Sequence, residues 1–328
     1  MKYFIIGGAG VFALHTIKKL LDIKSTTKVF SVGRSFERSS AFTLDIGKND
    51  KRYTYKQIHL TFEIDTMLEI LDKIKPDYII NFAALAHATS WKKSFRYYDT
   101  NITALAKLCE HLYDKKYLKQ FLQIGSSEIY GPTLNPAKET DIPNPTSPYA
   151  ISKLSADYHI LSCYNYNGFP GNIIRPSNCY GPTQLMYRII PKAILFGLMD
   201  KPFPLEGGGV SKKSFMHASD LAESIIKILH SKKLGQIYNA GTNKPVTMKY
   251  IIELIAKKLS LDTKEFIQIT KARKGEDKQY WINSDKIKKE LNWAPKISLE
   301  SGIDECIEWV LKYKKDLEKE TTEFTLRA

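Results

Sequence analysis

The start of the chain constrains its fold more than any other stretch. Residues 1–6 are mostly apolar, Gly7-Gly8-Ala9-Gly10 follows at once, and leucine and isoleucine then recur at helical spacing over residues 14–21. Strand, glycine turn and helix in this order form the context of a dinucleotide-binding fingerprint. Gly7 permits the tight turn, and Gly10 lets the backbone approach a pyrophosphate at the helix N-terminus. The third small position is Ala13. The turn therefore predicts a parallel α/β sheet that binds a dinucleotide.

The end of the second predicted strand bears on the choice of cofactor. Residues 28–32 (KVFSV) lead into Gly33-Arg34-Ser35. A site that prefers NAD usually has an acid here, which accepts a hydrogen bond from the ribose 2′-hydroxyl. A guanidinium beside a hydroxyl instead suits a 2′-phosphate. The sequence favours NADP and leaves NAD possible, since Arg34 is also an ordinary residue for a solvated loop.

Strands and helices alternate through the first half of the chain. Further strands are expected at residues 58–62, 78–82, 121–124 and 171–174, with helices at 66–75, 101–113 and 149–166. This alternation is typical of a Rossmann-type, doubly wound parallel sheet. After about residue 174 it loosens, which predicts a smaller α/β C-terminal substrate domain. We expect a nucleotide-binding domain at 1–175 with returns near 215–245, a substrate domain at 176–315 and a polar tail at 316–328, fraying from Lys314.

Residues 123–153 carry the side chains best suited to chemistry. Tyr149 and Lys153 are four residues apart and share one face of a helix. A lysine ammonium stabilises a phenolate, so such a pair supplies a general base near neutral pH. Ser126, Ser127 and Glu128 follow an apolar strand and add hydroxyls and a carboxylate. Taken alone, a Tyr–Lys pair at this spacing is a common accident on helices.

Composition excludes several classes of protein. Apolar residues make up 43% and charged residues 26% of the 328, which is typical of a soluble globular protein, and no stretch suits a membrane span. The net charge of +14 raises the alternative of nucleic-acid binding, but the lysines are scattered among acids. The four cysteines form no CxxC and there is no histidine cluster, so we expect no disulfide, no metal and a cytoplasmic location.

Eight motifs in order resemble the extended short-chain dehydrogenase/reductase family, specifically its nucleotide-sugar 4,6-dehydratases of the dTDP-glucose and GDP-mannose kind. They cover nearly the whole chain: GGAG at 7–10, NFAA at 81–84, GSSEIYG at 125–131, SPYAISK at 147–153, RPSNCYGP at 175–182, KSF at 213–215, YNAG at 238–241 and LNWAPKISLESGI at 291–303. The resemblance implies conversion of a nucleoside-diphosphate hexose to a 4-keto-6-deoxyhexose, and a homodimer built on helices 101–113 and 149–166.

The resemblance also implies roles for individual residues. Tyr149 removes the proton of the sugar C4 hydroxyl, Lys153 holds the cofactor ribose and lowers the pKa of Tyr149, and Ser126 hydrogen-bonds the 4-hydroxyl. Glu128 removes the C5 proton and returns it to the departing C6 hydroxyl, which Ser127 orients. Expected cofactor-binding residues are Gly7, Gly10, Val11, Phe12, Arg34, Ser35, Ala83 and Ala84, together with Tyr149 and Lys153. Expected substrate-binding residues are His87, Asn178, Arg188, Lys213 and Arg273.

Departures from the family pattern keep alternatives open. Dehydratases of the dTDP-glucose kind read T-D-E and those of the GDP-mannose kind T-S-E, whereas this chain reads Ser126-Ser127-Glu128. The acid that usually contacts adenine is missing from residues 58–62, and Lys213 replaces an arginine that binds the diphosphate. The nucleotide base therefore stays open among dTDP, GDP, UDP and CDP. A 4-epimerase, a 4-dehydrogenase and a non-catalytic dinucleotide sensor remain as alternative functions.

Overall fold

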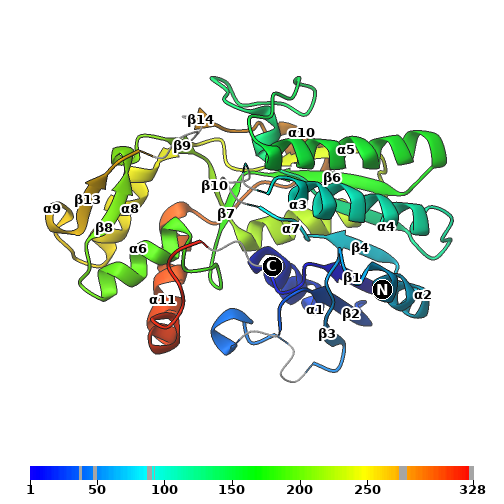
Figure 1. Ribbon diagram of the computed structural model, residues 1–328, viewed down its shortest axis with the longest axis horizontal. Helices are drawn as coiled ribbons and strands as arrows, with labels where there is room; N and C mark the ends of the chain where they lie inside the picture. Colours follow the sequence, from blue (N-terminus) through cyan, green and yellow to red (C-terminus); the bar gives the residue numbers. More distant parts are fainter. Residues whose placement is uncertain (37–38, 47–49, 87–90, 92, 273–278, 325–328) are drawn as a thin grey trace.

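A parallel sheet forms the centre of the molecule. The computed structural model describes residues 1–36, 39–46, 50–86, 91, 93–272 and 279–324. Across the sheet, its seven parallel strands run in the order β11 (Ile237–Ala240), β6 (Gly171–Pro176), β5 (Gln120–Ile124), β4 (Tyr78–Asn81), β1 (Lys2–Ile6), β2 (Lys28–Gly33) and β3 (Tyr53–Gln57) (Figure 1). The predicted Rossmann-type, doubly wound parallel sheet is confirmed.

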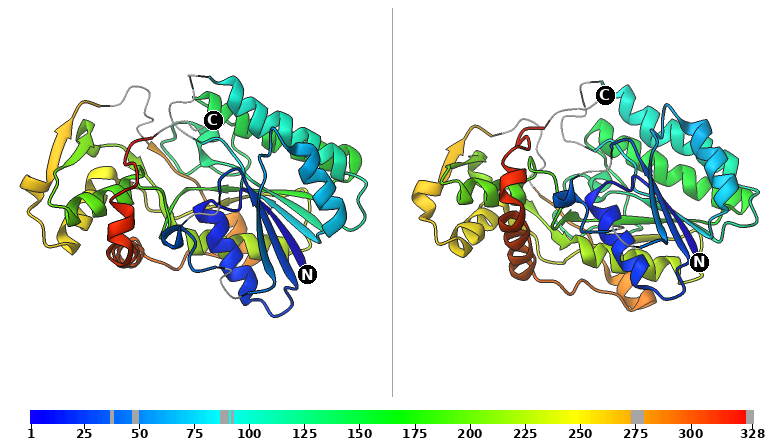
Figure 2. Two further views of the ribbon diagram at one scale, coloured as in Figure 1. Left: turned by 60° about the horizontal axis from the view of Figure 1, so that its bottom comes forward. Right: turned by 90° about the horizontal axis from the view of Figure 1, so that it is seen from below.

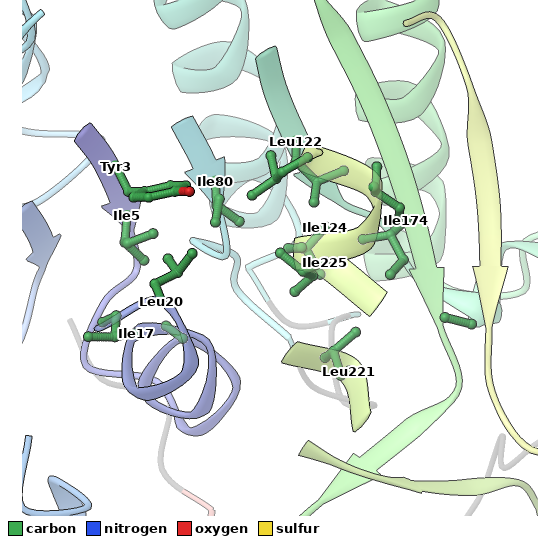
Figure 3. Packing of buried hydrophobic residues seen from close by; sticks show 14 of the residues in the cluster. Tyr3, Ile5, Ile17, Leu20, Ile80, Leu122, Ile124, Ile174, Leu221 and Ile225 are labelled. Carbon is green, nitrogen blue, oxygen red and sulfur yellow. The ribbon is translucent and has the colours of Figure 1, made fainter. Parts of the chain in front are cut away.

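Helices cover both faces of the sheet because the buried strands are apolar on both sides. One face packs against α1 (Val11–Asp22) and α7 (Ala218–Leu229), and the other against α2 (Ile64–Ile74), α4 (Ala104–Leu112) and α5 (Pro148–Asn167). Alternate residues of β1 face opposite ways, so Tyr3 and Ile5 join the first cluster while Phe4 joins the second. Figure 3 shows the first cluster, in which Ile17 of α1 and Ile225 of α7 lie below the strands.

The third strand lies earlier in the sequence than we predicted. Residues 58–62 were expected to form it, but β3 covers Tyr53–Gln57 and pairs with β2 at the edge of the sheet. Ile58 and Leu60 are buried outside the strand, at 2% and 6% exposure. Their alternation imitates a strand because every second side chain of this loop turns toward the protein interior.

A third hydrophobic cluster gathers the elements that follow β6. It is formed largely by α6 (Ile189–Leu198), α8 (Met248–Lys258) and α11 (Leu299–Leu317), which lie together beside the sheet (Figure 2). Short strands accompany them: β7 (Asn178–Tyr180) with β10 (Phe215–His217), β8 (Phe203–Glu206) with β13 (Ile267–Thr270), and β9 (Lys212–Lys213) between β12 (Val246–Thr247) and β14 (Gln279–Tyr280). The remaining helical elements are η1 (Ser40–Phe42), α3 (Phe95–Tyr98), the π-helix η2 (Asp99–Thr103), η3 (Ser127–Tyr130), η4 (Gly207–Gly209), α9 (Thr263–Phe266) and α10 (Asp285–Leu291).

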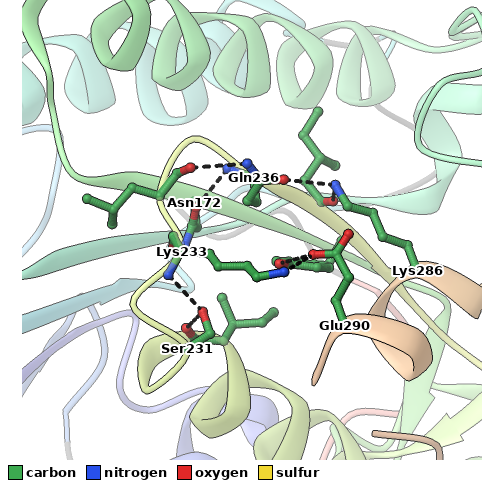
Figure 4. A network of polar contacts seen from close by, with 10 residues as sticks. Asn172, Ser231, Lys233, Gln236, Lys286 and Glu290 are labelled. Atoms are coloured by element: carbon green, nitrogen blue, oxygen red, sulfur yellow. Dashed lines mark hydrogen bonds and ion pairs between the residues drawn. The ribbon is translucent and has the colours of Figure 1, made fainter. Parts of the chain in front are cut away.

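Polar side chains fasten the outer strand β11 to its surroundings (Figure 4). The Asn172 carboxamide accepts a hydrogen bond from the backbone N–H of Gln236 at 2.8 Å, and Lys286 of α10 donates to the Gln236 side chain at 3.1 Å. Glu290 accepts from Lys233 at 2.7 Å and from the Tyr238 hydroxyl at 3.0 Å. These contacts hold α10 against this edge of the sheet.

The C-terminal segment is more ordered than the sequence suggested. We expected fraying from Lys314, but α11 continues to Leu317, whose side chain is fully buried. Beyond the helix, Glu323 accepts a hydrogen bond from Lys192 at 2.9 Å, and the Phe324 ring lies 5.3 Å from the Tyr187 ring. These contacts bring the segment to a cavity at the carboxyl ends of the central strands, which is described below. No helix in the described part of the chain combines the length and apolar character needed to cross a membrane.

Candidate active site

A cavity of about 690 Å³ opens at the carboxyl ends of β1, β2 and β4. Its volume is in the range of small-molecule and cofactor sites, and in doubly wound sheets ligands bind at this edge. The lining includes residues from the glycine turn, the end of β2, the loop after β4 and the segment before α6: Gly7, Gly10, Arg34, Ser35, Ala83, Ala84, Tyr187 and Arg188. Most of the expected cofactor residues thus share one cavity.

The glycine turn is built for close approach. Gly7 has a φ of +85°, and a Cβ atom there would lie 2.7 Å from the backbone nitrogen of Ala83. Gly10 caps α1 without a side-chain acceptor, so the first amides of the helix are left for another partner. Val11 and Phe12 open the helix, and the Phe12 side chain packs against the core; neither residue lines the cavity. Helix amides beside a glycine turn fit the pyrophosphate of a dinucleotide.

Arg34 and Ser35 line the cavity where β2 ends. The Gln57 side chain donates to the Arg34 carbonyl at 3.0 Å, and the Tyr55 hydroxyl donates to the Ser35 carbonyl. These bonds fix the backbone of the segment while the Arg34 side chain is exposed. A guanidinium therefore lies at the position where a dinucleotide places its adenosine ribose.

Ser126, Ser127 and Glu128 form a tight turn directly after β5. The Ser126 hydroxyl caps η3 by accepting a hydrogen bond from the Glu128 backbone N–H at 3.2 Å. Tyr149 lies in the first turn of α5, which begins with the cap Ser147. Burial raises the pKa of Tyr149 and the Glu128 carboxylate raises it further, whereas a hydrogen bond with Ser126 and the charge of Arg188 lower it. The structure thus brings Ser126, Glu128 and Tyr149 together, as the sequence predicted.

Lys153 lies one helical turn after Tyr149 and is only 2% exposed. Its ammonium donates to the backbone carbonyl of Ile124, the last residue of β5. Burial lowers the pKa of Lys153 to about 8, and the nearby Asp157 carboxylate opposes this shift. A lysine with such a pKa is still mostly charged at neutral pH and can stabilise a phenolate.

Asn101 is a buried residue of this region that sequence reasoning missed. Its carboxamide accepts from the Leu85 N–H at 3.0 Å, and it donates to the Leu85 carbonyl at 3.2 Å and to the Ser152 hydroxyl at 2.9 Å. Ser152 in turn donates to the Tyr149 carbonyl at 2.7 Å. Asn101 therefore joins the loop after β4 to the start of α5. Asn101 lies in the π-helical turn η2, which only the structure reveals, and π-turns are frequent at functional sites.

The expected substrate residues are dispersed. Arg188 lines the cavity, and its guanidinium lies 5.1 Å from the centre of the Tyr187 ring. Asn178 begins β7 and Lys213 ends β9, and neither lines the cavity. His87 and Arg273 fall outside the described residues. Among the described residues, no group of three or more His, Cys, Asp or Glu side chains could hold a metal ion. Sequence reasoning missed several lining residues: His59, Thr61, Arg96, Thr100, Glu320, Thr321 and Phe324.

Comparison with known proteins places the chain in a family. The family model described as GDP-mannose 4,6 dehydratase matches residues 4–306. The chain is 28% identical over 326 residues to mouse dTDP-D-glucose 4,6-dehydratase, covering 95% of this chain and 89% of that one. The crystal structure of dTDP-glucose 4,6-dehydratase from Bacillus anthracis in complex with NAD has a TM-score of 0.87 and 27% identity, covering 97% of this chain and 99% of that one.

An epimerase of known structure is also similar. UDP-glucuronic acid 4-epimerase from Bacillus cereus, solved with UDP-glucuronic acid and NAD, has a TM-score of 0.86 and 25% identity, covering 95% of this chain and 99% of that one. The family match over residues 4–306 and the dehydratase relatives favour dehydration over epimerisation. The chain therefore belongs to the GDP-mannose 4,6 dehydratase family of extended short-chain dehydrogenases/reductases, and is a nucleotide-sugar 4,6-dehydratase that depends on a nicotinamide dinucleotide.

Proposed function

We propose that Ser126, Glu128, Tyr149 and Lys153 carry out the dehydration of a nucleoside-diphosphate hexose in this chain. The observation that supports this most directly is that the Glu128 carboxylate and the Ser126 hydroxyl both act on the Tyr149 phenol. A base for the C4 hydroxyl and a carboxylate for the C5 proton must both reach the same sugar ring, so the two groups must lie close to each other. A 4-epimerase needs only the first of these groups.

Each side chain has a defined proton to hold or move. Tyr149 accepts the proton of the C4 hydroxyl, assisted by Ser126, and Lys153 stabilises the phenolate. When bound, a nicotinamide dinucleotide takes up a hydride from C4 and returns it to C6. The 4-keto group makes the C5 hydrogen acidic, so Glu128 removes it and passes it to the C6 hydroxyl, which leaves as water. C5 then regains a proton, which balances the proton that Tyr149 took from the C4 hydroxyl. Overall, the sugar loses one water.

The test of this function is a mass measurement on product. The protein is incubated with dTDP-, GDP-, UDP- and CDP-hexoses, and the expected result is loss of one water from at least one of them. A substrate that keeps its mass while its C4 centre inverts would replace dehydration by 4-epimerisation. Net formation of a 4-keto sugar without water loss would indicate a 4-dehydrogenase, and dinucleotide binding without any turnover a sensor.

We further propose that Arg34 makes the site prefer NADP over NAD. Its exposed guanidinium at the end of β2 suits a 2′-phosphate through charge-assisted hydrogen bonds. Arg34→Ala is expected to weaken NADP binding roughly 10–100-fold and to leave NAD binding nearly unchanged. Isothermal titration with both cofactors measures this, with Lys56→Ala on the neighbouring strand as the matched control. Equal weakening of both cofactors, or of neither, contradicts the preference.

We also propose that the protein acts as a homodimer in the cytoplasm. Large apolar side chains are exposed at the C-terminal end of α4 and along α5, including Tyr113, Ile151 and Tyr158 at 53%, 41% and 54% exposure. The four cysteines are free thiols, which suits a reducing compartment. Sedimentation of the purified protein measures the oligomeric state.

A further inference from the structure

A buried ion pair lies one helical turn beyond Lys153. Asp157 of α5 accepts a hydrogen bond from the Arg175 side-chain Nε of β6 at 2.8 Å, and the two side chains are 0% and 2% exposed. Tyr149, Lys153 and Asp157 are spaced four residues apart and therefore share one face of the helix. The pair thus lies in line with Tyr149, the proposed general base, and with Lys153, which stabilises its phenolate.

A buried pair of this kind is costly to keep. Removing two charges from water costs several kcal/mol for each ion, and apolar replacements of buried pairs are often neutral or stabilising. Here the pair is also incompletely satisfied, because among the described residues Oδ1 of Asp157 has no hydrogen-bond partner. A pair that served only to fasten α5 to β6 would gain nothing from this unused, buried oxygen.

A glycine leaves room for the unused oxygen. Gly125 follows Ile124, whose carbonyl accepts a hydrogen bond from the Lys153 ammonium. A Cβ atom at Gly125 would lie 3.2 Å from Oδ1 of Asp157 and 3.0 Å from the Arg175 side chain. The glycine therefore leaves the space in which the carboxylate lies close to the end of β5, where Lys153 is bound.

The pair continues into a chain of hydrogen bonds. Arg175 donates through Nη1 to the Tyr130 hydroxyl at 2.7 Å, and this hydroxyl donates to the Asn239 carboxamide at 3.0 Å. Glu139 accepts from the Asn239 backbone N–H at 2.7 Å. Tyr130 is the last residue of η3, the turn that also carries Ser127 and Glu128. The pair therefore connects α5 to the turn that holds the proposed elimination base.

We propose that Asp157 is a positioning residue that, paired with Arg175, keeps the buried Lys153 side chain in its ammonium form and α5 fixed against η3. The inference rests on the proposed roles of Tyr149 and Lys153.

Charge balance supports this role. The charged and titratable groups around Lys153 are Tyr149 and Asp157 on its own helix, Arg175 on β6, and Glu128 and Tyr130 on η3, with Arg188 acting on Tyr149 from the start of α6. Burial alone pushes the lysine toward its neutral form, and Asp157 is the group that opposes it. A neutral lysine could no longer stabilise a phenolate, so activity should fall as Lys153 loses its proton.

The test is the pH profile of kcat/KM for Asp157→Asn. Loss of the carboxylate favours neutral Lys153, so the alkaline limb of the profile, which follows loss of the Lys153 proton, should move down by about one pH unit, a roughly 10-fold loss of rate on that limb. Asp157→Glu keeps the charge and should restore the limb. Asp304→Asn, an exposed site on α11, is the matched control.

A double variant keeps the test decisive if Asp157→Asn does not fold. Asp157→Asn with Arg175→Gln leaves no unpaired buried charge, yet still removes the carboxylate from Lys153. It should show the same downward shift of the alkaline limb as the single variant. A folded double variant whose pH limb matches the wild type would overturn the inference and leave the pair a fastening between α5 and β6.

A second readout needs no turnover. Because the folded protein holds Lys153 at a pKa of about 8 and the unfolded chain at about 10.4, the unfolded state binds more protons above pH 8. The free energy of unfolding therefore rises with pH in this range. In Asp157→Asn the rise should begin at a lower pH, and in Lys153→Met its Lys153 component should vanish. Urea unfolding from pH 6 to 9 measures both.

The proposed catalytic roles and the proposed role of Asp157 can fail separately. If Lys153→Met and Tyr149→Phe keep wild-type activity, the proposed catalytic roles are wrong. If those variants lose activity while the folded Asp157 variants keep both the kinetic limb and the stability profile of the wild type, only the inference about Asp157 is wrong.

Discussion

Tyr149→Phe is expected to lower kcat roughly 10²–10⁴-fold, the usual contribution of a general base, or about 3–5 kcal/mol of transition-state stabilisation. The substitution removes one hydroxyl and keeps the ring, so the helix face and its packing remain. Since the missing proton acceptor acts in the oxidation half of the reaction, neither a 4-keto sugar nor a dehydrated product should form.

Single-turnover mixing with mass detection measures this loss, and a matched control lies on the same helix. Tyr158→Phe removes a hydroxyl from a side chain of α5 that is 54% exposed, and it should leave kcat unchanged. The acidic limb of the wild-type pH profile reports Tyr149, so it should be absent from the residual activity of Tyr149→Phe. Retention of that limb with full activity would assign the base to another residue.

Glu128→Gln is expected to separate the two halves of the reaction. The Glu128 charge raises the pKa of Tyr149, so its loss should lower that pKa and let oxidation begin at lower pH than in the wild type. Elimination should slow roughly 10²–10⁴-fold because the carboxylate that takes the C5 proton is gone. The variant should therefore accumulate a 4-keto sugar that has kept its C6 hydroxyl, in an amount equal to the enzyme.

Rapid quench with mass spectrometry detects this sugar, and near-ultraviolet absorbance of the reduced nicotinamide follows it in time. Glu265→Gln, an exposed residue of α9, serves as the control and should turn over normally. Normal dehydration by Glu128→Gln would remove this residue from the mechanism. Loss of the oxidation step as well would show that the side chain acts on Tyr149 rather than on C5.

Sequence reasoning was most successful where local patterns and tertiary structure agree. The apolar strands near the sheet centre could be predicted because burial on both faces leaves uninterrupted apolar runs. The edge strand β3 could not, since Tyr53–Gln57 is only partly buried and pairs with one neighbour. The buried Ile58 and Leu60 of the following loop carried the stronger strand pattern.

The site residues also divide into those that local sequence predicts and those whose contacts depend on packing between distant elements. Spacing along one helix was enough to associate Tyr149 with Lys153, and a strand end was enough to add Ser126 and Glu128. Arg175 and Asp157 are eighteen residues apart on different elements, so their contact depends on how α5 packs against β6. The approach of Phe324 to Tyr187 likewise requires the return of the chain from α11, which no local pattern records.

The position of β11 has a consequence for the order in which the protein folds during synthesis. β11 and α7 come from residues 218–240, yet β11 completes the sheet beside β6, and Ser219 at the start of α7 contacts His15 of α1 at 2.9 Å. A nascent chain that ends before this stretch therefore has an unpaired edge at β6 and an uncovered apolar face on α1. Its nucleotide-binding half must wait for a segment made long afterwards, and in that interval the exposed edge invites association with other chains.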